Sequence, residues 1–206
     1  MQHLHSLDHV QLSSAWISIG SFDGVHRGHQ SLVKNLVDEA HRAGHPAVII
    51  TFFPHPVVVL RKITDAHYLS SPEERAALLA KSGIDLLITL PFTLELAAVS
   101  AADFMQRLSE RLGVRQLWVG ADFALGRNRE GSVSRLREIG ERMGFDVRVI
   151  DPVLDEHEVI SSSLIRAAVR AGRVREAARM LGRNYTVSGE VIHGDGRGHS
   201  LGIPTA

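Results

Sequence analysis

The sequence predicts an α/β protein whose parallel sheet is covered by helices on both faces. Five runs of residues have the length of buried strands and are apolar throughout instead of alternating, as strands covered on both faces are. Helical patterns separate these runs, and such alternation is typical of a parallel sheet. Ligands of such sheets bind beyond the carboxyl ends of the strands. The expected strands are Ala15–Ile19, Ala47–Phe53, Leu86–Leu90, Gln116–Gly120 and Val147–Ile150.

The expected helices show recognisable boundaries. Ser71, followed by Pro72 and Glu74, has the composition of a helix start, and Gly83 and Gly113 are suitable helix ends. The expected helices are Gly28–Ala43, Pro72–Ser82, Ala101–Leu112, Ser132–Met143, Ser161–Ala171 and Val174–Leu181.

The character of the chain changes after Gly182. Residues Tyr185–Ile192 alternate between polar and apolar, which predicts a strand, and four glycines then crowd the last part of the sequence. We therefore expect an α/β domain over residues 1–183, followed by an incomplete β-rich segment over residues 184–206.

The composition limits the classes of function. The chain has 206 residues, of which 44% are hydrophobic and 22% charged, as in globular proteins. Lysine and arginine together equal aspartate and glutamate at 23 each, which argues against a broad basic surface for nucleic acid. The absence of cysteine excludes disulfides and thiolate chemistry and suits a reducing compartment.

No targeting or membrane segment is predicted. Residues Met1–Val10 lack the apolar core of a signal peptide, and the most apolar window, Ala47–Leu60, is too short to cross a bilayer. We therefore expect a cytoplasmic protein with no nucleic-acid or membrane partner. The oligomeric state stays open.

The strongest functional signal is the segment Gly20–His29, GSFDGVHRGH, between the first expected strand and the first helix. Glycines at a strand-to-helix junction let backbone N–H groups approach an anion, and the helix N-terminus adds partial positive charge. His26 and His29 flank Gly28, so both imidazoles can face the same phosphate group. A tight turn with surface histidines is the alternative. Two histidines without a third ligand make a poor metal site.

The second signal is the segment Thr51–Pro56, TFFPHP, at the end of the second strand. Its prolines fix the backbone and disfavour helix at the residues before them, which predicts a stiff loop. Phe53, Pro54 and His55 would then form one wall of a cleft for a nucleotide or an aromatic ring. A rigid packed connector is the alternative.

The third signal is the segment Val119–Gly131 at the end of the fourth strand. Asp122 is a candidate for a ribose hydroxyl, and Arg127 and Arg129 are candidates for phosphate because guanidinium groups suit it. A solvated loop of mixed charge is the alternative.

The fourth signal is the serine-rich segment Ile160–Arg166, ISSSLIR. Serines cap the free N–H groups of a helix start, and capping alone is common. Three hydroxyl groups with an arginine one turn into the helix are also suited to holding phosphate.

Taken together, the four segments resemble the bacterial bifunctional riboflavin kinase/FAD synthetase family. GSFDGVHRGHQ is similar to the family's GxFDGxHxGH loop, and TFFPHP, VGADFALGRNREG and SSSLIR are similar to its next three motifs. The tail with HGDGRGHSLGIPTA resembles the start of the riboflavin kinase module. The first loop alone would indicate only the nucleotidylyltransferase superfamily, with its Rossmann-like fold.

The resemblance implies adenylyl transfer, in which FMN and ATP give FAD and pyrophosphate with Mg²⁺. His26 and His29 would hold the ATP phosphates and stabilise the reacting α-phosphate, and Ser162, Ser163 and Arg166 would hold the β- and γ-phosphates. The other implied nucleotide-binding residues are Gly20, Phe22, Asp23, Gly24, Gly28 and Asp122. The implied flavin-binding residues are Phe53, Pro54, His55, Phe92, Phe123 and Arg127. The magnesium ligands are not assigned.

The chain departs from the family pattern in three respects. Ser163 replaces a threonine and keeps a hydroxyl group, and Leu125 replaces an aromatic residue near the flavin. The kinase-like tail ends at Ala206, so we expect no riboflavin phosphorylation. The competing interpretations are a related nucleotidylyltransferase with another acceptor, and a non-catalytic flavin- or nucleotide-binding module.

Overall fold

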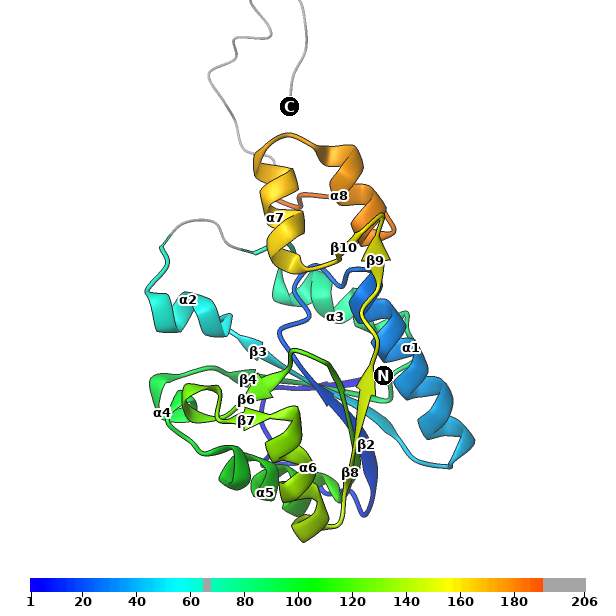
Figure 1. Ribbon diagram of the computed structural model, residues 1–206, viewed down its shortest axis with the longest axis vertical. Helices are drawn as coiled ribbons and strands as arrows, with labels where there is room; N and C mark the ends of the chain where they lie inside the picture. Colours follow the sequence, from blue (N-terminus) through cyan, green and yellow to red (C-terminus); the bar gives the residue numbers. More distant parts are fainter. Residues whose placement is uncertain (65–67, 191–206) are drawn as a thin grey trace, which may run out of the picture.

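The computed structural model describes residues 1–64 and 68–190, and its centre is a six-stranded, fully parallel sheet (Figure 1). The strand order is β1-β4-β3-β2-β5-β8. The sheet confirms the predicted class and all five predicted strands. The short edge strand β1 was not predicted, because its three residues show no apolar run. The strands are β1 (Gln2–Leu4), β2 (Ala15–Ile19), β3 (Ala47–Phe53), β4 (Leu86–Pro91), β5 (Val114–Gly120) and β8 (Asp146–Ile150).

The six predicted helices are present, with boundaries shifted by no more than two residues. Ser71 and Glu74 form a reciprocal capping box at the start of α3. Gly113 ends α5 with φ = 58°, and a Cβ at this position would lie 2.4 Å from the Ser13 carbonyl oxygen. The helices are α1 (Arg27–Arg42), α3 (Pro72–Ala80), α5 (Ala101–Leu112), α6 (Val133–Met143), α7 (Ser162–Arg170) and α8 (Val174–Leu181).

The sheet buries a separate hydrophobic cluster on each face. Ile17 and Ile50 face the cluster that contains Phe104 of α5 and Leu136 of α6. The opposite face packs against α1 and α3 through a second cluster that includes Leu36. Burial on both faces explains why the strand sequences are apolar throughout.

Short elements occupy segments where the sequence predicted only loops. The stiff loop expected over Thr51–Pro56 is limited to Pro54 and His55, because β3 runs to Phe53 and α2 begins at Pro56. Proline is favoured at the first helical position, and the His55 Nδ1 atom caps this helix by accepting the Val57 N–H at 3.1 Å. The short elements are α2 (Pro56–Arg61), α4 (Leu94–Ala97), β6 (Ala124–Leu125), β7 (Gly131–Ser132), β9 (Leu154–Asp155), β10 (Glu158–Val159) and the 3₁₀ turn Arg127–Arg129.

Helices α7 and α8 form a separate layer at the end of the molecule opposite α5 and α6 (Figure 1). A third hydrophobic cluster joins them, and it includes Leu69, Ile165 and Met180. The predicted strand over Tyr185–Ile192 is absent from its described part, because residues 185–190 form neither helix nor strand. Most of the expected β-rich segment, residues 191–206, lies outside the described residues.

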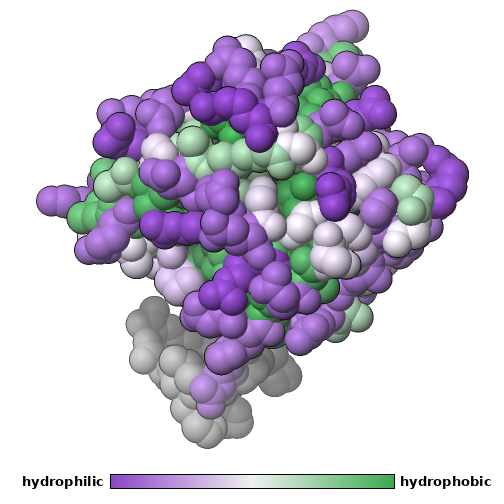
Figure 2. Space-filling view, turned by 90° about the horizontal axis from the view of Figure 1, so that it is seen from below, coloured by the Kyte–Doolittle hydropathy of each residue, from purple (hydrophilic) through white to green (hydrophobic). Residues whose placement is uncertain are grey.

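The molecular surface mixes hydrophilic and hydrophobic residues. On the face seen in Figure 2, hydrophobic residues are scattered among hydrophilic ones. Within residues 1–64 and 68–190, no helix combines the length and the hydropathy that crossing a bilayer requires.

Candidate active site

The glycine–histidine loop leaves the end of β2 in an unusual backbone conformation. Phe22, Gly24 and Val25 all have left-handed φ angles, of 48°, 74° and 40°. The N–H of Gly24 donates to Ser70 Oγ (3.0 Å) and that of Val25 donates to the Phe22 carbonyl (3.0 Å). These two amides are therefore used within the protein. The amides left for an anion are those of Arg27 and Gly28 at the start of α1, where a helix has no internal acceptors.

His26 and His29 stack at the start of α1, with ring centroids 3.7 Å apart and planes inclined by 21°. The Nδ1 atom of His26 caps the helix by accepting the His29 N–H at 3.4 Å. An accepting Nδ1 leaves the proton of the neutral ring on Nε2. This ring therefore offers one N–H donor to a ligand at the helix N-terminus.

Both rings are neutral near pH 7. His26 is 6% exposed, and burial lowers its pKa to about 4 against the opposing charge of Asp23. Burial also lowers the pKa of His29 well below its ordinary range, with further contributions from His26 and Arg75. A neutral imidazole can donate a hydrogen bond from its N–H group, and its protonation state does not have to change for it to do so.

A buried ion pair joins the loop to α7. The Asp23 carboxylate is 0% exposed and accepts Arg166 Nη1 at 2.8 Å, together with the N–H groups of Leu69 (3.0 and 3.1 Å) and Ser70 (3.2 Å). We expected Asp23 to contact a nucleotide. Its carboxylate is instead enclosed by protein donors, so it acts on the site by holding Arg166.

The serine-rich helix start meets the same loop. Ser161 is the N-cap of α7 and accepts the Leu164 N–H at 3.2 Å, whereas Ser162 Oγ donates to the Asp23 carbonyl at 2.9 Å. Ser163 Oγ lies 3.5 Å from Arg166 Nη2. The N-termini of α1 and α7 are thus fixed beside one another, and both favour anions.

A buried arginine that the sequence reasoning missed ties the second motif to the first. Arg75 of α3 is 1% exposed and donates from Nη1 to Thr51 Oγ1 (3.4 Å) and to the Phe52 carbonyl (3.2 Å). Thr51 Oγ1 in turn donates to the Ser21 carbonyl at 3.0 Å. Helical spacing with buried Ala76 and Leu79 could have revealed that Arg75 points inward.

The candidate aromatic residues differ in exposure. Phe53 is 40% exposed and lies 5.6 Å from the Tyr68 ring, and its carbonyl accepts the Phe92 N–H at 3.2 Å. Phe123 packs partly buried against the larger core cluster. Phe53 and Phe92 therefore share one edge of the sheet, at the carboxyl ends of β3 and β4. Phe53 is the more exposed of these candidate flavin contacts.

The third motif follows β5, the neighbour of β2. Ser18 pairs with Trp118, so Gly20 and Gly120 leave the sheet at the same end. Asp122 is exposed and hydrogen bonds through its carbonyl to Arg129 Nη2 at 3.0 Å. Arg127 is exposed and lies 4.0 Å from Glu130. Over the described ranges, no side-chain hydrogen bond joins Asp122 or Arg127 to the histidine pair.

The described residues offer no metal cage. No group of three or more histidine, aspartate or glutamate side chains gathers for a metal ion in residues 1–64 and 68–190. The Asp23 carboxylate, whose charge acts on His26, already accepts protein donors. The donor set in the described residues therefore does not fit a Mg²⁺ ion held by protein side chains alone.

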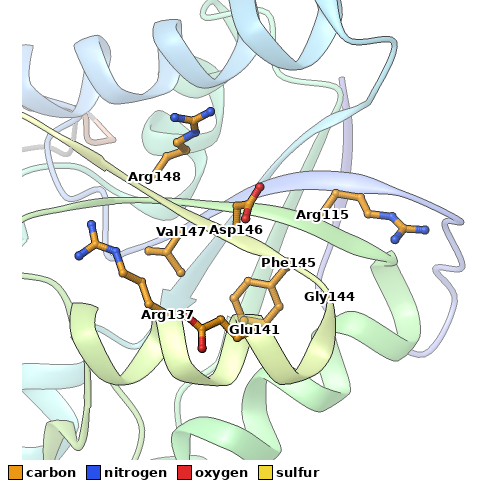
Figure 3. Close-up of a pocket in the computed structure, with 9 residues that line it drawn as sticks. Arg115, Arg137, Glu141, Gly144, Phe145, Asp146, Val147 and Arg148 are labelled. Carbon is orange, nitrogen blue, oxygen red and sulfur yellow. The ribbon is translucent and has the colours of Figure 1, made fainter.

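A separate hollow of about 610 Å³ lies at the amino ends of β5 and β8. It is at the opposite end of the sheet from the histidine pair. In Figure 3 its three arginine head groups point away from one another, and Glu141 and Asp146 lie among them. This mixed arrangement shows no convergent group for a ligand. The labelled lining residues are Arg115, Arg137, Glu141, Gly144, Phe145, Asp146, Val147 and Arg148.

Comparison with known families agrees with the motif order. A family model described as FAD synthetase matches residues 8–164, and one described as riboflavin kinase matches residues 181–206. A bifunctional riboflavin kinase/FMN adenylyltransferase of Listeria monocytogenes is 36% identical over 92% of this chain and 60% of its own length. That of Escherichia coli is 32% identical over 98% of this chain and 65% of its own length. The chain therefore spans less than two thirds of these relatives.

Solved structures show the same fold. A Streptococcus pneumoniae crystal structure described as a macrolide-efflux protein has a TM-score of 0.84 and 28% identity, covering 98% of this chain and 66% of its own. A pantoate-β-alanine ligase from Francisella tularensis, complexed with a β-γ ATP compound and β-alanine, has a TM-score of 0.55 at 12% identity. It covers 87% of this chain and 79% of its own, and it supports the fold alone.

The parallel sheet with a histidine–glycine loop at the end of β2 defines a Rossmann-like protein of the nucleotidyltransferase type. Within that class, the chain belongs to the FAD synthetase family, whose model matches most of its length. The FAD synthetase match ends at residue 164 and the riboflavin kinase match begins at residue 181. The domain boundary after residue 183 stays a prediction.

Proposed function

We propose that the chain is an FMN adenylyltransferase that transfers AMP from ATP to FMN and releases pyrophosphate. The observation that carries this proposal is the junction of the two phosphate-binding motifs. The Asp23–Arg166 ion pair and the Ser162–Asp23 hydrogen bond hold the N-termini of α1 and α7 together beside the histidine pair. Membership of the FAD synthetase family and the names of the relatives support the choice of FMN as acceptor.

The reaction needs no protein base. An oxygen of the FMN phosphate attacks the α-phosphorus of ATP, and the bond from that phosphorus to the oxygen bridging to the β-phosphate breaks. A phosphate monoester has its second pKa near ~6, so the nucleophile is largely dianionic at neutral pH. The protein must instead reduce the repulsion between two polyanions and align them for attack.

Each motif has a distinct part in this scheme. His26 and His29 donate to the α-phosphate as its charge changes, with Gly20, Phe22, Gly24 and Gly28 shaping the loop. The Ser163 hydroxyl, Arg166 and the backbone N–H of Ser162, whose own hydroxyl donates to the Asp23 carbonyl, bind the β- and γ-phosphates. A Mg²⁺ ion bound to ATP would reduce the charge of the β- and γ-phosphates that these residues hold. Asp122 follows the carboxyl end of β5, beside the loop that carries the histidines, and contacts the nucleoside of ATP.

The flavin would lie against the carboxyl ends of β3 and β4. Phe53, Phe92 and Phe123 supply apolar surface, Pro54 and His55 shape the adjoining turn, and Arg127 lies on the loop after β5. We infer that this site distinguishes FMN from riboflavin through the phosphate group. Equal affinity for the two flavins in a titration would contradict this.

The direct test is incubation with FMN, ATP and Mg²⁺, followed by chromatographic detection of FAD and measurement of pyrophosphate. Phosphopantetheine and nicotinamide mononucleotide serve as competing acceptors. Adenylylation of either one in preference to FMN would assign the chain to another reaction. Binding of ATP and FMN without pyrophosphate release would make it a binding module.

Riboflavin with ATP is the fourth arm of the experiment. We expect no FMN from the 206-residue chain, since only residues 181–206 match the riboflavin kinase model. Formation of FMN would contradict this part of the proposal.

A further inference from the structure

The guanidinium group of Arg183, which lies just after α8, hydrogen bonds to the glycine–histidine loop (Gly20–His29). Its Nη2 atom donates to the Gly24 carbonyl at 2.6 Å, and its Nη1 atom donates to the carbonyls of Val25 (3.2 Å) and Leu181 (3.4 Å). Arg183 lies in the segment that the riboflavin kinase model matches, whereas the loop lies in the FAD synthetase match. One side chain therefore links the two matched segments.

A glutamine completes this clamp. Gln30 Nε2 of α1 donates to the carbonyls of Val25 (2.8 Å) and Leu181 (2.9 Å). Gly182, with φ = 70°, fits against α1 so closely that a Cβ would lie 3.3 Å from Arg27 Cγ. The end of α8 is thus fixed to the first turn of α1.

The clamped backbone is the strained part of the loop. Val25 is β-branched and has φ = 40°, a conformation that is costly for such residues and persists only where the surroundings enforce it. Hydrogen bonds from a charged donor are the stronger kind, and the Val25 carbonyl accepts one from Arg183. Val25 directly precedes His26, so the orientation of its peptide sets the direction in which the His26 side chain leaves the loop.

We propose that Arg183 is a positioning residue for adenylyl transfer, which holds the Gly24 and Val25 carbonyls and thereby fixes His26 in the phosphate site. This inference rests on the proposed function. The described residues after Arg183 contact the domain through Tyr185, which packs against the α7–α8 cluster, and Ser188, whose Oγ donates to Glu74 Oε1 at 2.5 Å. The start of the kinase-like segment thus contributes to the adenylyltransferase site.

The charge of Arg183 provides a separate signature. The groups that act on the His26 ring are Asp23, which raises its pKa, Arg183, which lowers it, and the stacked His29 ring, on which Arg75 acts in turn. Removing the Arg183 cation should therefore raise the pKa of His26. A loss of packing alone would lower activity at every pH without this shift.

The test compares Arg183→Met and Arg183→Lys with the control Arg175→Met, an exposed arginine on α8. FAD formation gives kcat and KM for ATP from about pH 3 to 9, a range that brackets the His26 pKa of about 4 and the ordinary range of histidine. We expect kcat of Arg183→Met to fall by roughly 10- to 100-fold, the scale of a misplaced catalytic group. Its acid limb should move to higher pH. The kcat of Arg183→Lys should lie between those of the wild type and Arg183→Met, and its acid limb should stay where it is in the wild type because the positive charge is kept. The control Arg175→Met should match the wild type.

Each other outcome is decisive. A wild-type chain that makes no FAD rejects the proposed function, and this inference with it. A folded Arg183→Met variant with the kcat and pH profile of the control rejects the inference alone. Thermal unfolding shows whether that variant folds. If it does not, a kcat of Arg183→Lys equal to that of the control overturns the inference.

Discussion

Burial makes the two site histidines hydrogen-bond donors instead of acids. His26 uses Nδ1 to cap α1, which leaves its Nε2–H for a ligand, and His29 stacks against it. A neutral donor can stabilise charge that develops on a phosphate without a change in its own protonation. The positive charge near the histidines comes instead from arginines: Arg166, which Asp23 holds in place, Arg183 and Arg75.

Replacing His29 by alanine tests the donor role. We expect kcat for FAD formation to fall by roughly 10²–10³, the scale of losing one preorganised donor. The control is His9→Ala, whose side chain is exposed at the N-terminal segment and should have no effect. Near-normal turnover of His29→Ala would remove His29 from the mechanism.

Replacing Asp23 by asparagine tests the buried ion pair. The change leaves the Arg166 guanidinium without its carboxylate, and breaking a buried pair costs about 3–5 kcal/mol of unfolding free energy. Asp38→Asn is the matched control, because Asp38 pairs with Lys34 on the surface of α1, where such a pair contributes about 0–1 kcal/mol. Urea titration measures both variants. Equal losses of unfolding free energy in the two variants would show that the buried Asp23–Arg166 pair stabilises the fold no more than the surface pair does.

Single residues show where sequence reasoning succeeded and where it could not. His26 and His29 could be selected as candidates because their motif follows a strand, and Ser162 because its motif opens a helix. Arg183 could not, since it contacts Gly24 from a distant part of the chain and no local pattern records that contact. The enclosure of Asp23 by Leu69 and Ser70 is likewise a product of tertiary packing.

At the scale of elements, the site consists of two helix N-termini brought together beyond the carboxyl ends of the strands. The start of α1 is capped by His26 and that of α7 by Ser161. Each terminus favours negative charge through its free amides and helix dipole. Joining two of them through Ser162 and Arg166 suits a ligand with several phosphate groups.

Two serines at the start of α7, Ser161 and Ser163, are expected to differ in role: one stabilises the helix and the other binds ATP. Ser161→Ala removes the N-cap and should lower the unfolding free energy by about 1 kcal/mol. Ser163→Ala leaves the cap intact and should instead raise KM for ATP, since Ser163 lies beside Arg166. Urea titration and initial rates on both variants measure the two effects. A stability loss in Ser163→Ala as large as in Ser161→Ala would contradict this division.

The main elements were predictable because apolar runs and caps are local signals. The strand Ala15–Ile19 and the helix Ala101–Leu112 were predicted with their observed bounds. The two-residue strands β6 and β7 were not, because pairs such as Leu125 with Gly131 form only after the chain has folded back. The capping role of His55 was missed for the same reason that His26 was taken only as a ligand: histidine is not a usual cap.

At the scale of the whole molecule, the buried neutral histidines link the fold to pH. The pKa of His26 is about 4 in the folded chain and near ~6.5 when the chain is unfolded. The unfolded chain therefore binds more protons between these values, so stability falls as the pH is lowered through that interval. His29 acts in the same direction.

Unfolding free energy measured at several pH values tests this linkage. Between about pH 6.5 and 4, His26 alone should contribute a loss of about 3 kcal/mol. His26→Asn keeps a good cap without a titrating ring and should lose less over this interval than the control His9→Asn. Identical losses in the two variants would show that the His26 ring does not drive the acid sensitivity.

The clamp from Arg183 also bears on how minimal fragments of this chain should be cut. A truncation directly after Leu181, the last residue of α8, would look harmless in a ribbon drawing, because every strand and helix described above would be kept. It would nonetheless strip the guanidinium from the carbonyls of Gly24 and Val25. Expression fragments intended for crystallography or screening should therefore retain the residues through Ser188, which anchors to Glu74.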